Sequence, residues 1–224
     1  MIATVPTRRV RAVNDCPVHP NGAFVLYWIT GNRRSRWNYS LQRAVDHAVT
    51  LGKPLVVLEL LSCALPWGSD RIHAAILDGM ANLADAFAEA GVTYHPFAER
   101  HPGEAGQLLK ALGDRACLVV TDDFPCYIVP GAVADAGAKL NTRLEAVDSN
   151  GLLPMDATDQ AFTLAHAFRR YLHKHLAPHL RDFPVAEPLS GLALPPGAVP
   201  ADVAARFPAT PGAVLWAPAR DYGA

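Results

Sequence analysis

The sequence has few cysteines and no closely spaced pair of them. Its four cysteines, Cys16, Cys63, Cys117 and Cys126, are scattered along 224 residues and form no C-x-x-C motif. This spacing excludes the dense disulfide framework of a small secreted scaffold. We therefore expect four free, buried thiols in a reducing cytoplasm.

Long apolar runs are also missing. The longest ones fall far short of the roughly 20 residues that span a bilayer. The N-terminal residues MIATVPTRRVRAV contain no apolar stretch of the kind found in a signal peptide. We expect a cytoplasmic protein with no membrane partner.

Neither sign of charge is in excess. The chain has 20 Lys and Arg residues against 21 Asp and Glu residues, with a formal net charge of −1. This balance excludes a protein that coats nucleic acid with a basic surface, although the arginines cluster locally. A hydrophobic fraction of 50% with 18% charged residues is typical of a globular domain with a real core.

Five short β-rich runs are present, at residues 24–30, 54–61, 92–97, 117–121 and 143–148. The first, second and fourth are continuously apolar, which is typical of strands buried on both faces of a parallel sheet. Helical patterns alternate with them, at residues 37–51, 70–90, 104–112 and 131–140. This alternation predicts a doubly wound, Rossmann-like α/β fold: a five-stranded parallel sheet with helices on both faces.

The C-terminal part of the sequence differs in composition. A last helix is expected over residues 160–180, and from about residue 184 the chain is rich in Pro, Ala and Gly. One short helix is predicted in this tail, at residues 201–206. We therefore divide the chain into an α/β domain, residues 1–183, and a linker-like tail, residues 184–224.

Ligands of open α/β sheets bind at the carboxyl ends of the strands, so residues there are the candidates for a binding site. The loop after the first strand reads GNRRSR and precedes a helix, an arrangement that is compatible with an anion site. The loop by itself favours the alternative, a solvated loop whose arginines pair with surface carboxylates. The candidate cofactor-binding residues near the strand ends are Trp28, Thr30, Arg33, Arg34, Glu59, Asp122 and Asp123.

The sequence shows no self-sufficient catalytic or metal site. It contains neither a nucleophile elbow nor an H-E-x-x-H motif, and GNRRSR is not a known nucleotide-binding motif. The pair Asp122 and Asp123 is more typical of helix caps or loop acceptors than of catalysis. Four histidines on the last predicted helix are best explained by a basic, solvent-facing surface. We expect no catalytic residue and no metal ligand.

Several segments resemble the N-terminal α/β domain of class II DNA photolyases, in the photolyase and cryptochrome family. The first turn and strand match at Pro17, Val18, Pro20, Gly22 and residues 25–28; the next loop, helix and turn match at residues 33–36, Asn38, Leu51, Gly52 and Pro54. Further on, LVVTDDFPCYIVP and RLEAVDSNGLLP resemble the fourth and fifth strands, and AFTLAHAFRRYLHKHL resembles the helix that leaves the domain.

The resemblance implies a domain that holds an antenna chromophore of deazaflavin type. Members of the family use light and a reduced flavin to split cyclobutane pyrimidine dimers in DNA. Their FAD site lies in a helical domain to which no residue of this chain corresponds. The chain alone is therefore expected to be inactive in repair, and to reach DNA only through a separately encoded helical FAD-type partner.

A docking patch for that partner is expected at exposed apolar side chains: Trp67, Phe124, Tyr127, Ile128 and Trp216. The alternative function is a non-catalytic module of universal-stress-protein-like architecture that binds a nucleotide or chromophore. Such modules usually carry a Gly-rich phosphate loop late in the chain, and SNGLLP matches it poorly.

Overall fold

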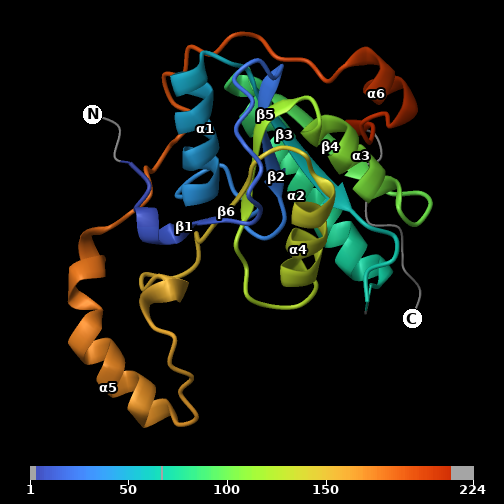
Figure 1. The fold of residues 1–224 in the computed structure, drawn as a ribbon. Helices are drawn as coiled ribbons and strands as arrows, with labels where there is room; N and C mark the ends of the chain where they lie inside the picture. Colours follow the sequence, from blue (N-terminus) through green and yellow to red (C-terminus); the bar gives the residue numbers. More distant parts are fainter. Residues whose placement is uncertain (1–3, 67, 213–224) are drawn as a thin grey trace.

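The computed structural model describes residues 4–66 and 68–212, which fold around a six-stranded sheet (Figure 1). The strands are β1 (Val10–Ala12), β2 (Phe24–Ile29), β3 (Leu55–Leu61), β4 (Thr93–Ala98), β5 (Ala116–Asp122) and β6 (Leu144–Val147). They lie in the order β1-β6-β5-β2-β3-β4. The five predicted strands are confirmed and pair in parallel, while β1 adds a short antiparallel edge strand beside β6.

Helices cover both faces of the sheet, as a doubly wound fold requires (Figure 1). Helices α1 (Tyr39–Leu51) and α2 (Asp70–Glu89) pack on one face, and α3 (Glu104–Gly113) and α4 (Val129–Lys139) on the other. From β2 the chain adds β3 and β4 on one side, then crosses to add β5 and β6 on the other. The topological switch point therefore lies between β2 and β5.

Strand β2 shows why the sheet is buried on both sides. All six of its residues are buried, and alternate side chains join opposite cores. Val25 and Tyr27 pack with α1 and α2, whereas Leu26 and Trp28 pack with α3 and α4. An uninterrupted apolar strand is what this two-sided burial demands.

Helix α1 begins and ends with capping residues that are visible in the sequence. The side chain of Asn38 accepts hydrogen bonds from the N–H groups of Ser40 and Leu41. At the other end Gly52 adopts a left-handed conformation with φ of 62°. The predicted helix over residues 37–51 is thus confirmed, with its start shifted by two residues.

The prediction of one continuous helix over residues 160–180 is wrong. The structure has α5 (Ala165–His175) followed by a separate 3-10 helix, η3 (Ala177–Arg181). Pro178 explains the break, because it has no N–H to donate to the carbonyl of Lys174. No residue of α5 is buried, and the helix stands away from the sheet (Figure 1).

The described part of the C-terminal tail packs against the α/β body. The predicted helix at residues 201–206 is confirmed as α6 (Ala201–Arg206). Val203 and Phe207 are each 3% exposed and join the core beside α3. The backbone N–H of Thr210 donates to the carbonyl of Pro96 in β4, at 2.7 Å. Two further 3-10 helices, η1 (Thr7–Arg9) and η2 (Met155–Ala157), complete the described elements.

The cysteines only partly match the expectation drawn from composition. All four are free thiols, but Cys117 alone is buried, while Cys63 and Cys126 are exposed. Loop positions next to the strand ends leave these two thiols in solvent. In the described part of the chain, no helix is both long and apolar enough to span a bilayer.

Candidate functional site

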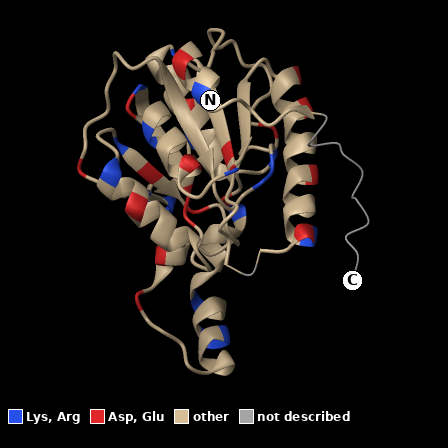
Figure 2. Ribbon diagram, turned by 90° about the vertical axis from the view of Figure 1, so that its right-hand side faces the viewer, with Lys and Arg blue, Asp and Glu red and all other residues tan. Residues whose placement is uncertain are grey.

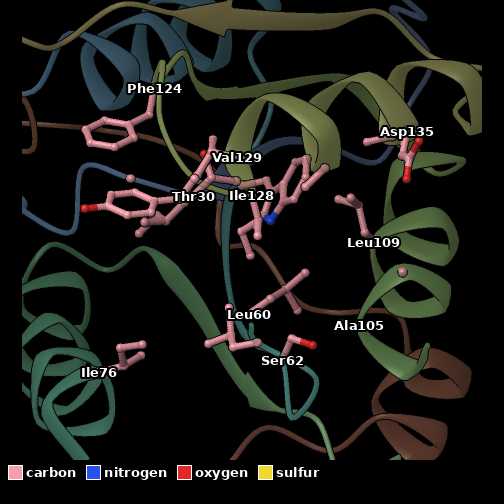
Figure 3. A pocket seen from close by; sticks show the side chains of 18 of the residues that line it. Thr30, Leu60, Ser62, Ile76, Ala105, Leu109, Phe124, Ile128, Val129 and Asp135 are labelled. Atoms are coloured by element: carbon pink, nitrogen blue, oxygen red, sulfur yellow. The ribbon is translucent and has the colours of Figure 1, made fainter. Parts of the chain in front are cut away.

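A cavity of about 720 Å³ lies over the carboxyl ends of β2 and β3, beside the switch point of the sheet (Figure 3). Its floor comes from the ends of these two strands, and helices α2, α3 and α4 form its walls. The residues that define floor and walls include Trp28, Thr30, Leu60, Ser62, Ile72, Ile76, Ala105, Leu109, Ala132 and Ala136. The cavity is therefore where the strand topology places a ligand site.

The loop after β5 forms the mouth of this cavity. Phe124, Tyr127 and Ile128 all line it, and Tyr127 and Ile128 are 84% and 40% exposed. Tyr127 has a φ of 58°, a left-handed conformation that is uncommon for a bulky residue. Of the residues predicted to form a docking patch, Tyr127 and Ile128 are exposed, Phe124 is half-buried, and Trp67 and Trp216 lie outside the described residues. That the patch docks a partner stays a prediction.

Asp122 organises the loop that follows β2. One of its carboxylate oxygens accepts the backbone N–H groups of Thr30, Gly31 and Asn32, at 2.9, 2.8 and 3.0 Å. Its other oxygen accepts the hydroxyl of Tyr27 at 2.9 Å. Asp122 is completely buried. The loop does bind an anion, but that anion is a carboxylate of the same chain.

Arg33 is held by the buried Glu59, which is in turn bonded to the half-buried Tyr94. Its Nε donates to Glu59 Oε1 at 2.7 Å, and the hydroxyl of Tyr94 donates to the other oxygen of Glu59 at 2.6 Å. Glu59 is fully buried, and this burial raises its pKa, although the bonds from Tyr94 and Arg33 act in the opposite direction. Burial and the nearby Glu59 charge raise the pKa of Tyr94, which therefore stays a neutral donor.

Arg34 and Asp123 are used elsewhere. The guanidinium of Arg34 donates to the carbonyl of Ser149 at 2.7 Å, and Asp123 pairs with Arg11 at 3.0 Å. Neither residue lines the cavity. The alternative of a solvated loop whose arginines pair with surface carboxylates therefore describes only part of GNRRSR, because Arg33 pairs with the buried carboxylate of Glu59.

The structure thus brings only some of the seven predicted residues together. Trp28, Thr30 and Arg33 line the cavity, Glu59 contacts Arg33, and Asp122 fixes the loop. Their participation in cofactor binding stays a prediction. The helix residues of the walls, among them Ile72, Ile76, Leu109 and Ala132, were missed, because their helical spacing is the same as that of ordinary core positions.

The lining determines what the cavity can do chemically. Most of it is apolar or aromatic, and its polar groups are the hydroxyls of Thr30 and Ser62, the guanidinium of Arg33 and the side chains of Lys110, Asp135 and Lys139. Such a lining suits a mostly apolar ligand that is oriented by a few polar contacts. Within residues 4–66 and 68–212, no group of three His, Cys, Asp or Glu side chains is placed to hold a metal ion.

Fold and cavity together define a doubly wound α/β domain with a ligand crevice at its switch point. No family model matches the chain. Among curated proteins, the chain is similar to the deoxyribodipyrimidine photo-lyase of Methanothermobacter thermautotrophicus, with 27% identity over 173 residues. The match covers 77% of this chain and 38% of that protein, so the chain spans well under half the length of its relative. The photolyase resemblance of the sequence is thereby confirmed.

Proposed function

We propose that this chain is the antenna-type α/β domain of a light-driven DNA repair system and holds a flat chromophore of deazaflavin type in its cavity. The similarity to a deoxyribodipyrimidine photo-lyase supports the repair context. The observation that carries the ligand is the apolar, aromatic-mouthed cavity at the sheet's switch point. An antenna transfers energy and needs orientation and a dry pocket, not an acid, a base or a nucleophile.

The cavity fits such a ligand by its volume of about 720 Å³ and by the chemistry of its walls. Leu60 and Leu109 offer apolar contact from β3 and α3, and Phe124 adds an aromatic ring from the loop after β5 (Figure 3). Tyr127 of the same loop adds a second ring to the lining. Stacking on aromatic rings stabilises planar ligands beyond the area that they bury. The chromophore would lie between these side chains and supply the light absorption.

The chemistry of dimer splitting belongs, in this proposal, to a helical FAD-type partner. This chain would then be inactive in repair by itself and would meet DNA through that partner. An assay with dimer-containing DNA, reduced FAD and light tests this point. Dimer splitting by the purified chain alone would contradict it.

The chromophore proposal is tested by titrating the purified chain with 5-deazariboflavin and following the ligand's fluorescence. We expect saturable binding that Ala132→Trp abolishes, because Ala132 lines the cavity wall on α4. Ala134→Trp, on the exposed side of the same helix, is the matched control and should bind as the wild type does. Absence of binding to the wild type would refute the proposal.

The nucleotide-binding alternative is separated by the same titration. ATP in place of the deazaflavin should show no saturable binding under the proposal made here. Binding of ATP that Ala132→Trp abolishes, without binding of the deazaflavin, would establish the alternative.

A further inference from the structure

We infer that the ligand of the cavity carries an acidic group, a carboxylate or a phosphate, and that the guanidinium of Arg33 binds it. Glu59 and Tyr94 act as positioning residues that aim Arg33 at the cavity. The inference rests on the proposed function, because it concerns the ligand of the same cavity. It adds the charge of one end of the ligand and the residue that binds this end.

The geometry around Arg33 supports this assignment. Glu59 engages only Nε of the guanidinium, at 2.7 Å, and Glu59 is itself fixed by the hydroxyl of Tyr94. Among the described residues, the two Nη groups of Arg33 have no hydrogen-bond partner. The side chain is 32% exposed and lines the cavity. Arg33 therefore offers free donors beside the space that a ligand would occupy.

The chemistry of a guanidinium then selects the ligand. Arginine keeps its charge at any ordinary pH and offers its N–H groups as a planar fork, which matches the oxygens of a carboxylate or a phosphate. An apolar ligand would leave these donors without an acceptor in a partly dry cavity, which is unfavourable. An acidic group would form charge-assisted hydrogen bonds with them.

Other cations of the lining are less suited to this role. Lys110 forms a salt bridge with Asp114 at 2.8 Å. Lys139 and Asp135 both line the cavity from α4, one helical turn apart, so a carboxylate lies near this ammonium group. Arg33 is thus the cation of the lining that combines a fixed position with free donors.

The test compares riboflavin with FMN, which has the same ring system and adds a phosphate. Dissociation constants are measured by fluorescence titration of the full chain. We expect FMN to bind the wild type at least about tenfold more tightly than riboflavin, the ratio typical of added charge-assisted hydrogen bonds. Raised salt should reduce this ratio only slightly, because the contact is partly buried.

Variants assign the preference to Arg33. Arg33→Gln should bring the ratio to about one without weakening riboflavin, and Arg33→Lys should restore little of it, since a lysine cannot engage Glu59 and the ligand together. Arg36→Gln is the matched control, because Arg36 pairs with Glu187 at 2.8 Å and does not line the cavity, so this variant should keep the wild-type ratio.

The positioning role is tested by Glu59→Gln, with Tyr94→Phe as a milder second variant should the first fold poorly. Both should lower the ratio while riboflavin still binds as it does to the wild type. If Glu59 only offset the charge of Arg33, Glu59→Gln would raise the ratio instead. That result would overturn the positioning role.

The remaining outcomes separate the two proposals. Equal binding of FMN and riboflavin by the wild type, or a preference for FMN that Arg36→Gln removes, would refute the assignment to Arg33 and leave the chromophore proposal standing. If none of FMN, riboflavin and 5-deazariboflavin binds, both proposals fail.

Discussion

The buried carboxylate of Asp122 should be a main determinant of stability, and Asp122→Asn tests this. Three backbone N–H groups converge on one of its oxygens, at 2.8 to 3.0 Å. The amide keeps the shape but replaces charge-assisted bonds by neutral ones, each weaker by about 1 kcal/mol. Burying an amide instead of a carboxylate costs less, which offsets part of this loss. We expect a net loss of about 2 kcal/mol in the free energy of unfolding.

The assay is urea unfolding followed by tryptophan fluorescence, since Trp28 is only 6% exposed and lies beside the loop. Asp123→Asn is the matched control, because the next residue forms a more exposed pair with Arg11, whose side chain is 55% exposed. Pairs of that kind contribute about 0–1 kcal/mol. If Asp122→Asn costs no more than Asp123→Asn, the reasoning about the loop is wrong.

Two further predictions concern pH and packing. Although burial itself raises the pKa of Glu145, the bonds from His47 and Arg43 lower that pKa to about 2. The ionised Glu145 therefore stabilises the fold by about 3 kcal/mol at most; this contribution is complete above pH 4.5 and is lost as the pH falls towards 2. In urea unfolding, the difference in free energy of unfolding between the wild type and Glu145→Gln should shrink over that range. A difference that stays constant would contradict the lowered pKa of Glu145. Phe207 is 3% exposed, whereas Phe168 of α5 is 40% exposed. In thermal unfolding, Phe207→Ala should therefore lower the free energy of unfolding by about 3–5 kcal/mol, and Phe168→Ala by under about 1 kcal/mol. Similar losses for the two variants would show that α5 is packed in solution.

The sequence predicts the sheet well because its strands have a strong local signal. Continuous apolar runs mark β2, β3 and β5, and Gly52 marks the end of α1. Strand β1 has three residues and no such signal, so it is missed. The break between α5 and η3 follows from Pro178, a local feature that could have been used.

Of the candidate site, only the floor, formed by the ends of β2 and β3, can be predicted from the sequence. Residues that follow strands are identified by the general rule for parallel sheets, which correctly places Trp28, Thr30 and Arg33 at the cavity. The walls depend on how α2, on one face of the sheet, and α3 and α4, on the other, are placed around the strand ends, a tertiary property without a sequence signature. The position of α5 could not be predicted from its charge either. This helix carries basic and no acidic residues (Figure 2), yet nothing in its sequence indicates that it lies away from the sheet.

The arginine-rich loop after β2 shows why a basic turn before a helix is not sufficient evidence for a phosphate site. In a phosphate-binding turn, free backbone N–H groups face the ligand. Here Asp122 accepts three of these N–H groups, and the side chain of Asn38 caps α1. Strands β2 and β5 are parallel neighbours, and Trp28 is paired with Thr121. This register places Asp122, the next residue of β5, beside the loop after β2. The Asp122 carboxylate thus occupies the backbone N–H groups of the turn. An external anion would have to bind to side-chain donors instead, and in this loop Arg33 offers such donors.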